Sequence, residues 1–134
     1  MEFATDPSPL RTELRHAGWC LEYVAVDAGP GRSNRALVAF HGFARPLEDL
    51  LVMAERWPEP ARLICVHLPH HGASGPCDPI LPADAALEPR VLVEMLQRMA
   101  EREGCDPDDM DLIGYSIGGR VALALIVAVP GLWG

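Results

Sequence analysis

At residues 114–119 the chain reads Gly114-Tyr115-Ser116-Ile117-Gly118-Gly119. Largely apolar residues precede this stretch at 110–113, and an apolar run follows it at 121–129. The two flanking runs predict a strand, a tight turn and then a helix. A serine between glycines at such a junction projects away from the backbone, which is how a nucleophile is presented. The alternative interpretation is a serine that caps the helix and has no catalytic role.

Two segments nearer the amino end have a related form. The apolar run Ala36–Phe40 is followed by His41-Gly42-Phe43, and the apolar run 63–68 is followed by Pro69-His70-His71-Gly72-Ala73-Ser74. Continuous apolar runs of this length are typical of strands buried on both faces of a parallel sheet. Three strands are therefore each followed directly by a loop rich in glycine and polar residues.

In this order the three segments resemble parts of the α/β-hydrolase family: the oxyanion loop after the third strand, the Pro-Gly-His-Gly-x-Ser loop, and the nucleophile elbow. His70 stands where glycine is usual in that loop. The resemblance covers residues 10–134, roughly the first half of a family domain. It implies a single partial α/β domain over 1–134, with 1–10 flexible. The expected sheet is mostly parallel, with helices on both faces, and is truncated after the helix that follows strand five.

The resemblance also implies roles for particular residues. Ser116 would be the nucleophile, and the backbone N–H groups of Phe43 and Ile117 would bind the oxyanion. The expected activity is esterase-like or thioesterase-like hydrolysis of a small-molecule ester or thioester. In this family the acid and then the histidine follow the serine, but no histidine follows His71 in this sequence. The positions of His70 and His71 argue against either one replacing the missing base.

Two alternatives follow from the same residues. The chain would be a catalytically incomplete fragment, or half of a split assembly, that associates with itself through an uncovered sheet edge. Alternatively, the elbow is similar to that of the menaquinone-pathway lyases of this fold, in which the residues matching Tyr115 and Arg120 contact substrate carboxylates. Arginine presents a bidentate fork suited to that contact. His41 is a third candidate for substrate binding, although its family position shapes a loop.

Composition argues against several other classes of protein. Nineteen acidic residues against eleven basic ones give a net charge of -8, which disfavours binding to nucleic acid or to anionic membranes. The four cysteines, Cys20, Cys65, Cys77 and Cys105, form no C-x-x-C pair, so their spacing suggests neither a zinc site nor a redox motif. His67, His70 and His71 lack a carboxylate or thiol motif to complete a metal site. No cofactor or metal is expected.

Targeting signals and membrane spans are also not indicated. The amino end lacks the basic start and apolar core of a secretory signal, so a cytoplasmic location is expected. Residues 112–133 are largely apolar, but their longest uninterrupted apolar run, at 121–129, has nine residues. A membrane span needs about 20. A helix buried in a protein core is therefore expected here.

The remaining elements follow from periodicity and from turn residues. Asp106, Asp108, Asp109 and Asp111 are expected to form a solvated turn. The expected elements are a hairpin of strands Leu10–Ala17 and Trp19–Asp27, a helix from Pro46 to Trp57, a strand Arg62–His67, a helix from Pro89 to Gly104, a strand Met110–Gly114 and a helix Ile117–Ala128.

Overall fold

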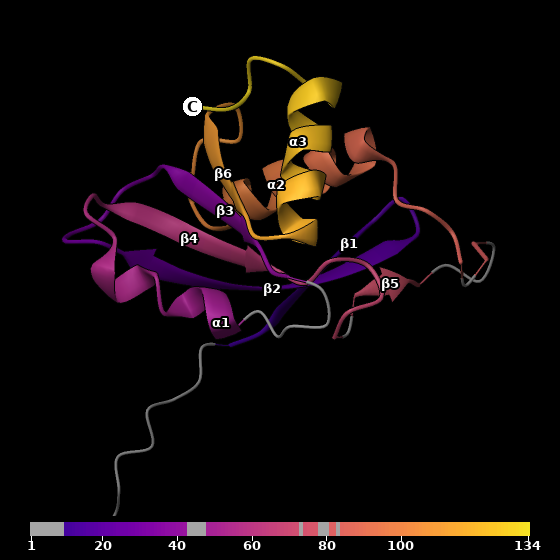
Figure 1. The fold of residues 1–134 in the computed structure, drawn as a ribbon, viewed down its shortest axis with the longest axis horizontal. Coiled ribbons are helices and arrows are strands. Elements are labelled where there is room, and N and C mark those ends of the chain that lie inside the picture. Colours follow the sequence, from indigo (N-terminus) through magenta and orange to yellow (C-terminus); the bar gives the residue numbers. More distant parts are fainter. Residues whose placement is uncertain (1–9, 43–47, 73, 78–80, 83) are drawn as a thin grey trace, which may run out of the picture.

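A computed structural model of the chain describes residues 10–42, 48–72, 74–77, 81–82 and 84–134 (Figure 1). The strands form a single sheet in the order β1-β2-β4-β3-β6, with a short strand, β5, paired to β2. The elements in chain order are β1 (Thr12–His16), β2 (Trp19–Ala28), β3 (Ala36–Phe40), α1 (Glu48–Leu51), η1 (Ala54–Arg56), β4 (Ala61–Val66), β5 (Gly75–Pro76), α2 (Pro89–Arg102), β6 (Met110–Gly114) and α3 (Ile117–Ala128).

The sheet is mixed, so the expectation of a mostly parallel sheet was wrong. β3 pairs in parallel with β4 and β6, whereas β2 pairs antiparallel with β1, β4 and β5. β1 and β2 form the expected antiparallel hairpin, whose turn residues Ala17 and Gly18 have φ of 51° and 83°. Two successive left-handed residues make the tight turn that joins antiparallel strands. The hairpin therefore adds an antiparallel region to the parallel βαβ units.

Helices cover both faces of the sheet, as the sequence predicted. All five residues of β3 are buried, because this central strand is covered from both sides. α2 and α3 pack on one face, and α1 with η1 lies on the other (Figure 1). Parallel strands with helices on both faces are the expected result of βαβ crossovers.

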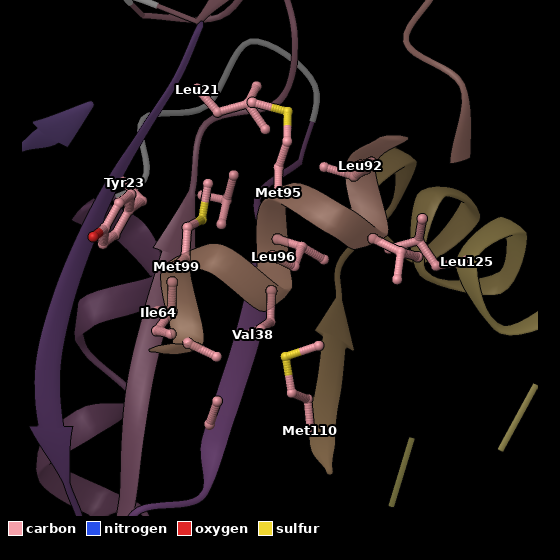
Figure 2. Close-up of a cluster of buried hydrophobic side chains, with 14 of the residues drawn as sticks. Leu21, Tyr23, Val38, Ile64, Leu92, Met95, Leu96, Met99, Met110 and Leu125 are labelled. Atoms are coloured by element: carbon pink, nitrogen blue, oxygen red, sulfur yellow. The ribbon is translucent and has the colours of Figure 1, made fainter. Parts of the chain in front are cut away.

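α2 supplies most of the helical core on its face of the sheet. Its buried residues recur at helical spacing, and Figure 2 shows Leu96 and Met99 beside the sheet residues Val38 and Ile64. Pro89 occupies the start of the helix, where its missing N–H costs nothing. Gly104, with φ of 77°, follows its end. Burial of each large apolar side chain stabilises the fold by about 1.5–3 kcal/mol. The buried residues are Leu92, Val93, Met95, Leu96, Met99 and Ala100.

The helix expected from Pro46 to Trp57 is shorter and interrupted. Leu50 and Leu51 belong to α1, but the chain then turns, and only the three residues of η1 follow. The Ala54 carbonyl accepts a hydrogen bond from Gly29 N–H at 3.0 Å, so a neighbouring loop uses an acceptor that a continuous helix would need. Pro46 itself lies outside the described residues.

The end of the chain returns to the sheet beside β6. Trp133 forms an isolated parallel bridge with Met110, whose N–H donates to the Leu132 carbonyl at 3.2 Å. The Gly134 N–H donates to the Met110 carbonyl at 2.9 Å. The edge of β6 is therefore paired at its first residue, and in the described part of the chain no named strand pairs with this edge. None of the helices in the described ranges has the length and apolar character needed to cross a membrane.

Candidate active site

The turn between β6 and α3 holds Ser116 in a sparsely populated conformation. Its φ is 58° and its ψ is -117°, and the residue is exposed. Its side chain makes no capping hydrogen bond to α3. Ser116 therefore occupies the N-cap position of α3, but its side chain does not serve as the cap. Strained backbone of this kind is found where the surrounding structure imposes a particular side-chain direction.

Close packing explains the glycines around the serine. A Cβ atom added to Gly118 would lie 2.5 Å from the Phe40 carbonyl oxygen and 2.7 Å from that of His41. A Cβ atom added to Gly114 would clash with the Gly118 carbonyl. The first turn of α3 thus packs directly on the end of β3. Gly118 brings Ser116 next to the loop that begins at His41.

The start of α3 offers a backbone donor beside the serine. The N–H groups of Gly118 and Gly119 donate to the carbonyls of Tyr115 and Ser116, both at 3.0 Å. The Ile117 N–H has no backbone acceptor among the described residues. Free N–H groups and the helix dipole both favour negative charge at a helix N-terminus. Phe43, the second expected oxyanion donor, lies outside the described residues.

His41 connects the loops that follow β3 and β4. The Leu68 N–H donates to its Nε2 at 3.0 Å, so its Nδ1 carries the proton and donates to the Gly42 carbonyl at 2.6 Å. Burial lowers the pKa of His41, and the neighbouring His71 and His67 lower it further, although the bond to Gly42 opposes them. Both ring nitrogens are bonded to backbone groups, so the geometry supports loop shaping rather than substrate contact.

A second histidine network lies next to His41 and was not identified from the sequence. His67 is buried and bonds through Nδ1 to Glu22 at 2.6 Å, and Arg11 pairs with the same carboxylate at 2.7 Å. The Glu22 N–H donates to Ser74 Oγ at 2.8 Å. The only sequence signal was an acidic residue within the apolar run of β2. This network attaches the loop after β4 to the sheet.

Three histidine rings from these loops lie together. The ring centroids of His41 and His71 are 4.6 Å apart, and those of His41 and His67 are 5.4 Å apart. His70, where the family pattern has glycine, has a φ of 67°, and its ring lies edge-on to Trp19. The described residues contain no group of three histidine, cysteine or acidic side chains suited to a metal ion.

An apolar pocket lies beside the first turns of α3. Its volume is about 240 Å³, and Ile117 lines it at the start of α3. Sites of this kind accept the apolar part of a ligand, while a few polar groups orient it. The other lining residues are Leu68, Pro69, His71, Leu87, Pro89, Leu92, Val121, Ala124 and Leu125.

The remaining candidates, Tyr115 and Arg120, lie on either side of Ser116 in the sequence. Tyr115 and Arg120 are both exposed, and the Arg120 N–H donates to the Ser116 carbonyl at 3.3 Å. No ion pair involving Arg120 is present within the described ranges. Both side chains are thus accessible close to Ser116.

The four aspartates at and just before the start of β6 form a solvated turn only in part. Arg35 binds both Asp111 carboxylate oxygens, at 2.6 and 2.8 Å, and binds Asp109 at 2.7 Å. These two carboxylates raise the pKa of Arg35 above its ordinary value. Asp106 accepts a hydrogen bond from the Asp108 N–H at 2.9 Å, as expected for a turn. The ion pairs join the start of β3 to the start of β6.

This fold is similar to that of α/β-hydrolase-like proteins. Epoxide hydrolase CorEH matches with a TM-score of 0.67 and 21% identity, over 92% of this chain and 39% of that chain. A proposed epoxide hydrolase from Pseudomonas aeruginosa matches with a TM-score of 0.72 and 19% identity, over 98% of this chain and 41% of that chain. A membrane phospholipase A matches with a TM-score of 0.66 and 21% identity, over 92% of this chain and 37% of that chain.

These similarities define the fold class and not the reaction, because all three identities are low. The chain spans about two fifths of the length of these structures. No family model and no curated protein matches the chain. The structure is therefore an α/β domain of hydrolase-like fold with a mixed sheet.

Proposed function

We propose that Ser116 is the nucleophile of an acyl hydrolase that acts on a small ester or thioester. The observation that carries this proposal is the geometry of Ser116, which is exposed, uncapped and held at φ 58° next to the Ile117 N–H. Hydrolase-like neighbours support the reaction class. The adjacent apolar pocket suits the acyl group of the substrate.

In the proposed reaction, Ser116 Oγ attacks the acyl carbonyl carbon and a general base accepts the hydroxyl proton. The Ile117 N–H donates to the oxyanion, and the Phe43 N–H is the second donor. The alcohol or thiol then leaves, and water hydrolyses the acyl-enzyme. Each oxyanion donor is worth about 3 kcal/mol in such a transition state. We propose that the base and its acid come from polypeptide outside these 134 residues, because similar structures are more than twice as long.

A hydrolysis assay tests this proposal. The 134-residue chain should hydrolyse p-nitrophenyl butyrate or an acyl thioester only slowly. Without a base, only the contributions of the oxyanion hole and of substrate binding remain. This residual rate does not require the serine hydroxyl, so the decisive readout is the acyl-enzyme. Intact mass should show slow acylation of the wild type and of Ser33→Ala, a change at a serine in the connector before β3, and no acylation of Ser116→Ala. Equal acylation of the wild type and Ser116→Ala would refute the proposal.

A lyase acting on a carboxylate substrate is the second candidate. Exposure of Tyr115 and Arg120 beside Ser116 favours it. Under this alternative, Arg120→Lys weakens carboxylate binding because lysine lacks the bidentate fork. Ester hydrolysis would not change, so comparing neutral and carboxylate substrates separates the two candidates.

The third candidate is a half of a split assembly without activity of its own. The open edge of β6 and the exposed apolar residues of α3 favour it. We propose that isolated chains associate through this region, which includes Leu123 and Val127, exposed by 65% and 82%.

A further inference from the structure

Cys20 and Cys77 are distant in sequence but adjacent in the fold. β5 pairs antiparallel with β2, so that Trp19 faces Pro76 and Cys20 faces Gly75. The Cys77 N–H donates to the Gly18 carbonyl at 2.8 Å, which extends the same register by one residue. Cys77 is thus opposite Gly18. Because side chains alternate along a strand, Cys77 and Cys20 project from the same face of the sheet.

The two side chains are near neighbours. Cys77 and Glu13 both lie close enough to the Cys20 thiol to raise its pKa. Diagonal cross-strand neighbours have Cα atoms about 7–8 Å apart, slightly beyond the usual limit of about 6.8 Å for a disulfide. β5 has only two residues and ends at Pro76. A small shift of Cys77 at the end of this ladder therefore brings the two sulfur atoms into bonding distance.

The accessibility of the two cysteines sets the order in which they react. Cys77 is exposed and Cys20 is buried. Burial raises the pKa of Cys20 to about 12, and the neighbouring Cys77 and Glu13 contribute to this shift. A reagent from solution therefore meets Cys77 first. Cys20 is the partner that completes the bond.

We propose that Cys20 and Cys77 form a reversible disulfide with a low-molecular-weight disulfide as the oxidant. With oxidised glutathione, the Cys77 thiolate attacks one sulfur atom, and one glutathione thiolate leaves. Cys20 then loses its proton and attacks the Cys77 sulfur, and the second glutathione leaves. Two protein thiols are oxidised and one glutathione disulfide is reduced. The two protons pass to the released glutathione thiolates.

The disulfide would fasten the loop between β4 and β5 to β2. This loop carries His71, at the candidate active site, and Ser74, which accepts the Glu22 N–H. A bond between residues so far apart in sequence restricts the unfolded chain strongly, so the oxidised protein should be the more stable form. The expected increase in Tm is about 5–10 °C.

Titration of the full chain with mixtures of oxidised and reduced glutathione tests the proposal. The intact mass of the protein should fall by the mass of two hydrogen atoms, and no glutathione should remain attached to the protein. Peptide mapping with fragmentation should join Cys20 to Cys77, and dithiothreitol should reverse both changes. Thermal unfolding of the two forms should show the Tm increase.

Two matched variants complete the experiment. Cys77→Ser changes an exposed side chain and should abolish both the disulfide and the Tm increase. Cys105→Ser changes a buried cysteine outside the pair and should preserve both. Stable glutathionylation of Cys77 with Cys20 still reduced would overturn the proposal. A Cys77–Cys77 dimer, or a disulfide to Cys65, would do so as well.

Discussion

At the scale of single residues, the candidate site depends on the glycines around Ser116 as much as on Ser116 itself, because side chains at Gly114 and Gly118 would clash with the backbone. Gly118, two residues after Ser116, lets α3 pack so closely on the end of β3 that an added Cβ atom would lie 2.5 Å from the Phe40 carbonyl oxygen. Gly119 is different, since an added Cβ atom there would lie 3.4 Å from its nearest neighbour, the Gly114 carbonyl oxygen. Two adjacent glycines thus have different roles.

Gly118→Ala should destabilise the fold by more than about 2 kcal/mol, because α3 must move away from β3 to admit the methyl group. Gly119→Ala is the matched control and should be neutral or stabilising by up to about 1 kcal/mol, since alanine is the better helix former. Urea denaturation of both variants measures the difference. Equal stability of the two variants would contradict the packing described for the elbow.

His41 should make stability depend on pH. Its folded-state pKa is lowered from 6.5, so the unfolded chain binds protons more readily below that pH. The His41 contribution to stability is therefore complete above pH 6.5 and is lost as the pH falls toward the folded-state pKa. Protonation of Nε2 also breaks the bond from the Leu68 N–H. Urea denaturation at pH 7.5 and 5.5 should show lower stability at the lower pH.

The control for this titration is His41→Gln, which retains an acceptor for the Leu68 N–H but cannot be protonated in this range. The loss of stability between pH 7.5 and 5.5 should be smaller in this variant. If His41→Gln loses as much stability between pH 7.5 and 5.5 as the wild type does, the pH dependence comes from other titratable groups.

At the scale of elements, most bounds, the antiparallel hairpin and the parallel pairing of β3 were predictable, whereas the pairing of β2 with β4 and β5 was not. β3, β6 and α3 have the residue ranges expected from their apolar runs. The antiparallel pairing of β2 with β4 could not be predicted, because β2 is buried along most of its length and its pattern does not identify its neighbour. β5 was missed because two residues carry no periodicity.

In the candidate site, too, features local in sequence were predictable and contacts between distant segments were not. Ser116 and its glycines could be singled out because their motif spans only a few consecutive residues. The contact of Glu22 with His67 and that of Cys20 with Cys77 were missed, since each joins elements distant in the chain. Contacts of this kind become visible only when the strand order is known.

The Arg35 ion pairs should stabilise the pairing of β3 with β6. Arg35→Met should lower the free energy of unfolding by about 1 kcal/mol, the upper range for partly exposed pairs, and high salt should reduce the difference. Arg32→Met, at an exposed position in the same connector, should have little effect. Urea denaturation at low and high salt checks both variants. Identical effects of the two substitutions would argue against a role for the ion pairs.

At the scale of the whole molecule, the arrangement of apolar surface is uneven. α2 buries its apolar face between the sheet and α3, whereas α3 buries only Gly118, Ala122 and Leu125. α3 packs against β6, and its residues Leu123, Ile126 and Val127 are exposed. Exposed apolar patches and open edges promote association.

The isolated chain should therefore associate as its concentration rises. Sedimentation velocity should show dimers or larger species, and Leu123→Glu with Val127→Glu should shift the population toward monomer. Exchanging Val52, which is also exposed but lies beyond α1, for glutamate is the matched control and should have no effect. A wild-type chain that stays monomeric at high concentration would contradict this prediction.

Fluorophosphonate labelling with site mapping by mass spectrometry tests the central claim, that the fold presents Ser116 as a nucleophile next to an oxyanion donor. The reagent should label Ser116 selectively over Ser33 and Ser74, at a slow rate, and Ser116→Ala should not be labelled. Absence of labelling, or equal labelling of all three serines, would contradict the account.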